Sequence, residues 1–162
     1  MHGIDLIEHL VGEVAAVSAR TATLLSERRL RDGRIVPVEN PDSAWCLYEL
    51  ANGVIASHEV SMIEQAGCDR FRMEIYGTKG TIWLRSERGA LAFARKGQSE
   101  WSVPNLPTPP FGQRQHRAWL EGVTGLAPRE QTARAGLRGL LVAEAIEQSQ
   151  AAGGQRIAVS LE

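Results

Sequence analysis

Asn52-Gly53 is the feature that most constrains the fold, because this pair separates two segments with the character of strands. Asn-Gly is a strong short-range signal for a β-hairpin, in which a tight turn joins two antiparallel strands. Residues 44–50 precede the pair, and residues 54–63 follow it with side chains that alternate between two faces. One of these faces holds Ala56, His58, Val60 and Met62. The chain is therefore expected to contain an antiparallel sheet.

Further strand-like segments accompany this hairpin, and helical patterns flank them. The charged segment 26–41 is expected to be an irregular surface excursion. Helices are predicted where apolar residues recur at helical spacing, over residues 3–10, 111–122 and 132–151. Further strands are predicted over residues 14–25, 70–76, 81–85, 90–95, 99–103 and 156–160.

This order of elements predicts an α+β fold with a mostly antiparallel, open-faced β-sheet and helices packed on one face. The other face carries both apolar and polar side chains, and such a face often packs against another subunit or domain. We expect it to be buried in a homodimer, with residues drawn from Trp45, Ile55, Arg72 and Trp83.

Length and charge limit what the chain can be. Its 162 residues suit one domain, and its 43% hydrophobic and 23% charged residues are ordinary for a soluble globular protein. The formal net charge of −1 argues against nucleic acid or an anionic membrane as the main partner. No apolar run approaches the roughly 20 residues needed to span a bilayer. The two cysteines form no Cys-x-x-Cys motif, which fits a protein of the reducing cytoplasm.

Five motifs follow one another along the chain. A histidine, two residues, an Asp-Leu pair and then a glycine occupy positions 2–12. The others are Glu-Asn-Pro-Asp-Ser-Ala at 39–44, Leu-Ala-Asn-Gly at 50–53, a strand with Gly-Thr-Lys-Gly at 71–82, and a closing helix at 136–153. In this order they resemble the C-terminal domain of the Gfo/Idh/MocA family of NAD(P)-dependent oxidoreductases. The resemblance covers nearly the whole chain.

The resemblance implies a division into domains. Enzymes of this family begin with a Rossmann domain that holds the dinucleotide, and their C-terminal domain is like that of glyceraldehyde-3-phosphate dehydrogenase. This chain has no G-x-G-x-x-G between a strand and a helix and no Glu-Lys-Pro segment. Residues 1–162 are thus expected to be a single substrate-binding and oligomerisation domain, with the N-terminal dinucleotide-binding domain absent. NAD or NADP would bind in the full-length parent, and no cofactor would bind to this chain.

The resemblance also implies a function. The parent enzyme would act on a sugar, polyol or inositol-like substrate, and the isolated chain would be inactive. The alternative is a standalone, non-catalytic dimerisation or ligand-binding module derived from that family. The choice of substrate depends on the geometry of contacts to its hydroxyl groups, which sequence patterns do not fix. The preference for NAD or NADP depends on residues of the absent domain.

The resemblance matches His2 to the catalytic histidine. Hydride transfer from an alcohol carbon requires the hydroxyl to lose its proton, which an imidazole can accept; a terminal histidine with no role is the alternative. Asp5 could contact substrate, or it could be a first-turn aspartate favoured by the helix dipole. His58 and Arg72, on predicted strands, are expected to contact substrate, with interface ion pairs as the alternative. His9 shares a face with His2 and Asp5, but their spacing is a weak metal motif and no metal site is predicted.

Overall fold

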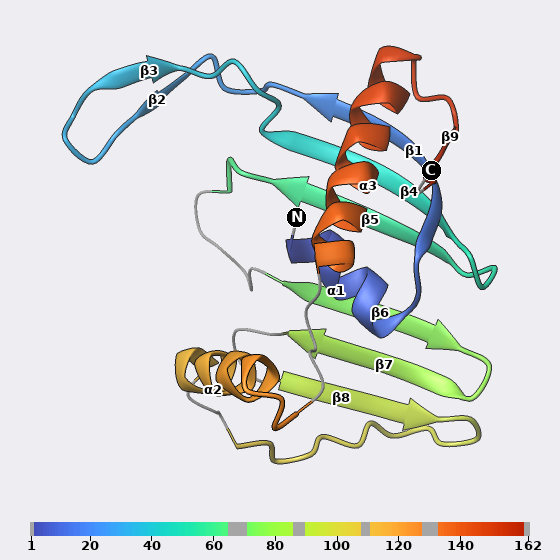
Figure 1. The fold of residues 1–162 in the computed structure, drawn as a ribbon. Helices are drawn as coiled ribbons and strands as arrows, with labels where there is room; N and C mark the ends of the chain where they lie inside the picture. The colour runs from blue at the N-terminus through green and yellow to red at the C-terminus, as the bar shows by residue number, and fades with distance from the viewer. Residues whose placement is uncertain (1, 65–70, 86–89, 108–110, 128–132, 161–162) are drawn as a thin grey trace. The chain divides into compact units, whose positions relative to one another are not determined.

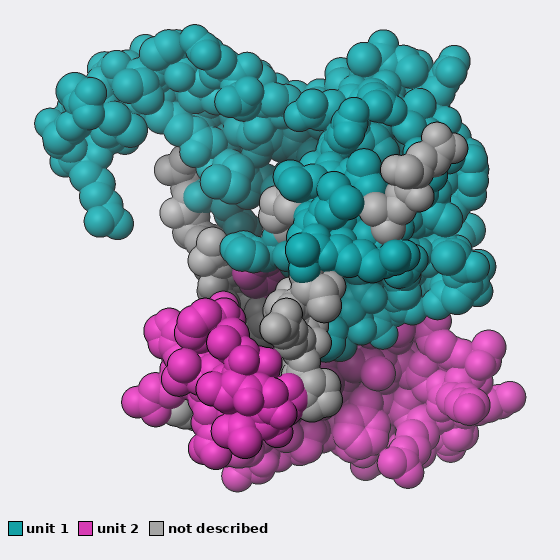
Figure 2. All heavy atoms as spheres, viewed as in Figure 1, with its two compact units in different colours: residues 1–65, 131–162 teal, residues 66–130 magenta. Residues whose placement is uncertain are grey.

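The computed structural model describes residues 2–64, 71–85, 90–107, 111–127 and 133–160. The chain divides into two compact units (Figure 2). The first unit comprises residues 1–65 and 131–162, and the second comprises residues 66–130. Three candidate site residues, His2, Asp5 and His58, belong to the first unit, whereas Arg72 belongs to the second.

A four-stranded antiparallel sheet forms the centre of the first unit (Figure 1). Helices pack on one of its faces and are joined to it by buried apolar side chains. The predicted α+β class with antiparallel strands is confirmed. The helices are α1 (His2–Leu10) and α3 (Ala133–Ala151). The strands lie in the order β5 (Ile55–Ser61), β4 (Ser43–Leu50), β1 (Val14–Ala22) and β9 (Ile157–Ala158).

Alternation along the strands separates a buried face from an open face. On β5, Ala56 and His58 are half-buried, while Ile55, Ser57 and Glu59 are exposed, as the alternating pattern predicts. The pattern fails further along, because Val60 and Met62, predicted on the same face as His58, are 39% and 63% exposed. The buried face of β1 and β4 contributes Val17, Ala19, Cys46, Tyr48 and Leu50 to the core. The helices contribute Ile4 and Ile7 from α1, and Val142 and Ala145 from α3. The open face lies opposite these helices.

The segment predicted as irregular, 26–41, instead contains a short antiparallel ribbon. Its strands are β2 (Glu27–Arg29) and β3 (Ile35–Pro37), and Arg28 pairs with Val36. Strands of three residues are too short to give an alternating pattern, so this part of the prediction was wrong for a physical reason. The ribbon projects from the first unit in Figure 1.

The strand predicted over residues 14–25 ends at Ala22 because its last residues find other partners. The backbone N–H groups of Leu24 and Leu25 donate to the buried carboxylate of Asp42, at 3.1 and 2.9 Å. These hydrogen bonds lower the pKa of Asp42, the bond from Leu25 having the largest effect. The Asp42 carboxylate thus takes the place of a neighbouring strand as the hydrogen-bond acceptor, and β1 ends before the ribbon begins.

The Asn52-Gly53 turn holds the junction between α1 and β1. Gly53 has a positive φ of 83°, whereas no non-glycine residue among those described has a positive φ. Asn52 contributes its side chain to this junction, because its Nδ2 donates a hydrogen bond to the carbonyl oxygen of Val11 at 2.8 Å. Gly12 has a φ of 147°, and a Cβ added there would lie 2.7 Å from Asn52 Nδ2. The hairpin signal therefore marks a turn that also fixes the end of the first helix.

Side chains near the end of α3 complete the edge of β1. The buried hydroxyl of Ser149 accepts a hydrogen bond from the backbone N–H of Ala19 at 2.8 Å and donates to the carbonyl oxygen of Gln155 at 2.6 Å. Gln150 Oε1 accepts from the N–H of Thr21 at 3.0 Å. Buried backbone donors need such partners, so these contacts fix α3 along the strand.

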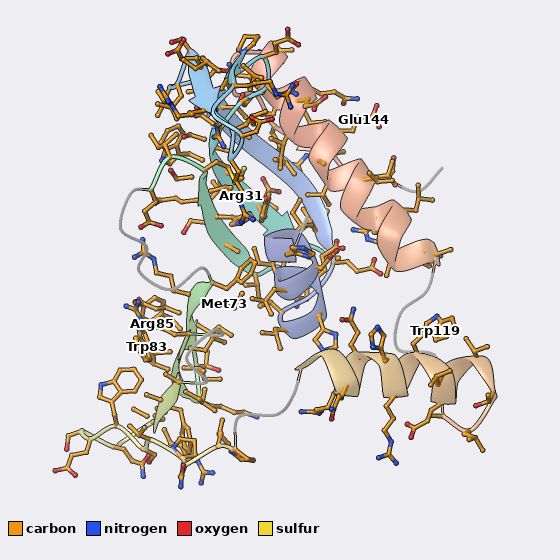
Figure 3. The ribbon with its side chains drawn as sticks, turned by 90° about the vertical axis from the view of Figure 1, so that its left-hand side faces the viewer. Arg31, Met73, Trp83, Arg85, Trp119 and Glu144 are labelled. Atoms are coloured by element: carbon orange, nitrogen blue, oxygen red, sulfur yellow. The ribbon has the colours of Figure 1, made fainter. Side chains whose placement is uncertain are left out.

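The second unit contains a three-stranded antiparallel sheet, with strands in the order β6 (Arg72–Gly77), β7 (Gly80–Arg85) and β8 (Ala90–Arg95). It also contains helix α2 (Phe111–Val123). On β7 the guanidinium carbon of Arg85 lies 4.8 Å from the centre of the Trp83 ring (Figure 3). This short-range stacking stabilises one face of the strand.

Two sheet predictions need correction. Hydrogen bonds divide the described strands into sheets of four, two and three strands, rather than one continuous sheet. The strand predicted over 99–103 is reduced to a single bridge between Ser102 and Phe93, because the prolines that follow cannot extend the ladder. Arg70, the first residue of another predicted strand, lies outside the described residues.

Candidate functional site

The first helix presents the predicted catalytic residue, His2, and the predicted substrate contact, Asp5, at its surface. Apolar residues at helical spacing bury Ile4 and Ile7 against the core. His2 and Asp5 lie on exposed positions of the first two turns, three residues apart. Residues at this spacing are neighbours on a helix surface. The helix therefore holds an imidazole and a carboxylate side by side, where a ligand could reach both.

His58 lies beneath the first turn of α1. A Cβ added at Gly3 would lie only 2.5 Å from His58 Nε2, so the ring occupies the space that a side chain at this position would need. At the other side of the ring, Nδ1 lies 2.9 Å from the hydroxyl oxygen of Tyr48. Tyr48 is fully buried. The half-buried ring thus lies between a buried phenol and the backbone of Gly3, the residue next to His2.

Burial determines the charge of this pair. It lowers the pKa of His58, because an imidazolium is poorly solvated there. Burial also raises the pKa of Tyr48, and the neighbouring Cys46 raises it further. The phenol therefore keeps its proton. The hydrogen bond between them therefore joins two neutral groups, and its direction depends on which ring nitrogen of His58 carries the proton.

We predict that His58 makes stability depend on pH. An unfolded imidazole titrates near the ordinary value of 6.5, and the folded pKa lies below it. The unfolded chain then binds more protons between the two values, so this stabilisation is present above pH 6.5 and is lost as pH falls through the folded pKa. Denaturant unfolding between about pH 7.5 and 5.5 checks this. His58→Gln should show a smaller pH dependence, and an equal dependence in both proteins would contradict the prediction.

A buried ion pair anchors the other end of α1. Arg138 of α3 donates from Nη2 to Glu8 Oε1 at 2.9 Å and to the carbonyl oxygen of Val14 at 2.7 Å. Glu8 Oε1 also accepts from the backbone N–H of Val14 at 3.0 Å. The two side chains are only 9% and 13% exposed. Helix α1 is therefore tied to both α3 and the start of β1.

The predicted site residues are only partly brought together. His2 and Asp5 share a surface of α1, and His58 packs against Gly3, the residue that follows His2. Arg72 is an exposed residue on β6 in the second unit. Glu8, Tyr48 and Arg138 were not identified from the sequence.

Within the described ranges, no group of three or more His, Cys, Asp or Glu side chains is arranged to hold an ion. His9 is exposed at the end of α1. Nor does any described helix combine the length and hydropathy that a bilayer-spanning segment requires.

Comparison with known proteins defines the class. The family model described as an oxidoreductase family C-terminal alpha/beta domain matches residues 1–159. The fold is thus that of an oxidoreductase C-terminal domain, with sheet and helices in the expected order. The chain belongs to the Gfo/Idh/MocA family.

Similar proteins are longer than this chain. Levoglucosan dehydrogenase of Pseudarthrobacter phenanthrenivorans is 31% identical over 100 residues, which cover 54% of this chain and 26% of that protein. Among solved structures, levoglucosan dehydrogenase in complex with NADH gives a TM-score of 0.85 at 23% identity. An NAD binding oxidoreductase from Klebsiella pneumoniae gives a TM-score of 0.84 at 22% identity. Each match covers 99% of this chain and 49% of the solved chain, so this chain spans about half their length.

Proposed function

We propose that this chain is the substrate-binding and oligomerisation domain of an NAD(P)-dependent oxidoreductase acting on a sugar, polyol or inositol-like substrate. The observation that carries the proposal is the surface of α1, where His2 and Asp5 are exposed on a helix fixed by buried contacts. A fixed base beside a hydrogen-bonding group suits oxidation of an alcohol. The family match and the levoglucosan dehydrogenase relative support this class of substrate.

In the proposed reaction, His2 accepts the hydroxyl proton while the adjacent carbon loses a hydride and a carbonyl forms. Asp5 accepts a hydrogen bond from a substrate hydroxyl and keeps it beside the imidazole. His58 and Arg72 are proposed as further substrate contacts. His58 would act close to His2 because its ring packs under Gly3.

The cofactor belongs to another part of the proposed parent protein. This chain's sequence has no glycine-rich turn between a strand and a helix, so its residues do not fit a dinucleotide. When bound in the parent, NAD or NADP supplies the hydride acceptor. The NADH complex of a similar solved protein supports this assignment. We further propose a cytoplasmic protein that forms a homodimer through the open sheet face.

Calorimetric titration with NADH tests whether the cofactor binds outside this domain. The 162-residue chain should give no saturable binding, because it has no site for the pyrophosphate. A longer protein, in which a dinucleotide-binding domain precedes this one, should bind NADH with a defined stoichiometry. Saturable binding to the 162-residue chain would contradict the proposal. Absence of binding to the longer protein would favour the non-catalytic module.

A further inference from the structure

The Tyr48 hydroxyl is a buried polar group that has no part in the proposed reaction so far. Tyr48 is fully buried on β4, so its hydroxyl has no access to water and needs a partner within the protein. His58 Nδ1 lies 2.9 Å from the hydroxyl oxygen. The strand register places Cys46, two residues before Tyr48, directly opposite His58. The three side chains therefore form one cluster between β4 and β5.

The proton of this hydroxyl determines the direction of the hydrogen bond. A phenol has one proton to donate, and a buried donor without an acceptor is unfavourable. His58 Nδ1 is an acceptor at hydrogen-bond distance, whereas the sulfur of the neighbouring Cys46 accepts only weakly. Donation from Tyr48 to Nδ1 is therefore the favoured arrangement, and it requires Nδ1 to carry no proton.

An unprotonated Nδ1 also defines the state of the other ring nitrogen. A neutral imidazole has one N–H group, so its proton must then lie on Nε2. Nε2 is the ring atom nearest to the first turn of α1, because a Cβ added at Gly3 would lie 2.5 Å from it. His2 precedes Gly3 and is exposed, and the His58 ring is only half-buried. The ring therefore presents an N–H donor beside the turn that carries His2.

We propose that Tyr48 is a positioning residue for substrate binding, whose hydroxyl donates to His58 Nδ1 and so keeps His58 Nε2 as a hydrogen-bond donor to a substrate oxygen. This inference rests on the proposed function, in which His58 contacts the substrate, and adds which atom makes the contact and what holds its proton there. An alcohol and the carbonyl compound formed from it both offer lone pairs on oxygen, so the same donor serves both. Such a contact contributes to binding more than to the rate of the chemical step.

Heteronuclear NMR of the histidine ring nitrogens in the 162-residue chain tests where the proton lies. Near neutral pH, His58 should show a protonated Nε2 and an unprotonated Nδ1, its signals being identified by their loss in His58→Gln. Tyr48→Phe should shift the Nδ1 signal, because that nitrogen loses its hydrogen bond. Tyr76→Phe is the matched control, because it removes the hydroxyl of an exposed tyrosine on β6 and should leave the His58 signals unchanged.

Kinetics of the longer two-domain protein test the role in binding, with glucose or myo-inositol as the alcohol, whichever is oxidised faster. Tyr48→Phe should raise KM by about 3- to 10-fold, the loss expected for one neutral hydrogen bond. Its kcat should stay within about 2-fold, because the contact is made in both the ground state and the transition state. Tyr76→Phe should change neither constant.

The outcomes separate the inference from the proposal on which it rests. A protonated Nδ1 in the unaltered chain, or His58 signals that Tyr48→Phe leaves unchanged, would overturn the inference. An unchanged KM in Tyr48→Phe, or a fall in kcat in place of the rise in KM, would also overturn it. If neither alcohol is oxidised, the proposed substrate class fails instead, and the ring-nitrogen signals still decide where the proton lies. Unchanged circular dichroism spectra ensure that all variants are compared as folded proteins.

Discussion

Arg138→Met is expected to lower the free energy of unfolding by about 3–5 kcal/mol, because it leaves a buried carboxylate without its cation. Arg138 contacts Glu8 and the carbonyl oxygen of Val14 through the same nitrogen, and its side chain is 9% exposed. Glu8 keeps its bond from the N–H of Val14, but one neutral donor does not replace a guanidinium. Urea unfolding measures the loss.

Two controls isolate the burial of this pair. Arg156→Met breaks an ion pair of the same chemistry with Glu49, but both side chains are about half exposed, so little stability should be lost. The double variant Glu8→Met/Arg138→Met removes both charges and should be more stable than Arg138→Met alone, because no unpaired charge remains buried. Equal losses in Arg138→Met and Arg156→Met would contradict the anchoring role of the buried pair.

His2→Ala in the longer two-domain protein is expected to lower kcat by about 10²- to 10⁴-fold, the usual contribution of a general base. The exposed position of His2 at the start of α1 means that its removal leaves the core intact. NADH affinity should not change, because the cofactor is proposed to bind in another domain. The rate of NADH formation from the substrate alcohol measures the effect.

His9→Ala is the matched control for this prediction. His9 is an exposed histidine near the other end of the same helix, so the variant removes an imidazole of similar exposure. Its kcat should stay within a few-fold of the unaltered protein. A similar kcat for both variants would remove His2 from the chemistry.

The sequence predicted those helices and strands whose formation depends mainly on residues close together in the chain. The strands proposed at 81–85 and 90–95 correspond closely to β7 and β8, and helix 132–151 corresponds to α3. These segments are rich in apolar residues and are followed in the sequence by charged residues or glycines. The short ribbon was missed because three-residue strands are too short to show periodicity.

The supporting contacts of the candidate site could not be predicted in the same way. Glu8 and Arg138 are 130 residues apart, so only the folded chain brings them together. Tyr48 and His58 are diagonal neighbours across β4 and β5, which depends on the register that the Asn52-Gly53 turn sets. The small size of Gly3 is explained only once His58 is seen beneath it.

Chemical rescue of His2→Ala tests most directly the claim that this domain supplies the proton acceptor. Added imidazole should raise the turnover of His2→Ala in the longer protein in a concentration-dependent manner, because it replaces the missing base. It should leave His9→Ala and the unaltered protein unchanged. Full turnover by His2→Ala without imidazole, or no response to imidazole while substrate still binds, would contradict the role assigned to His2.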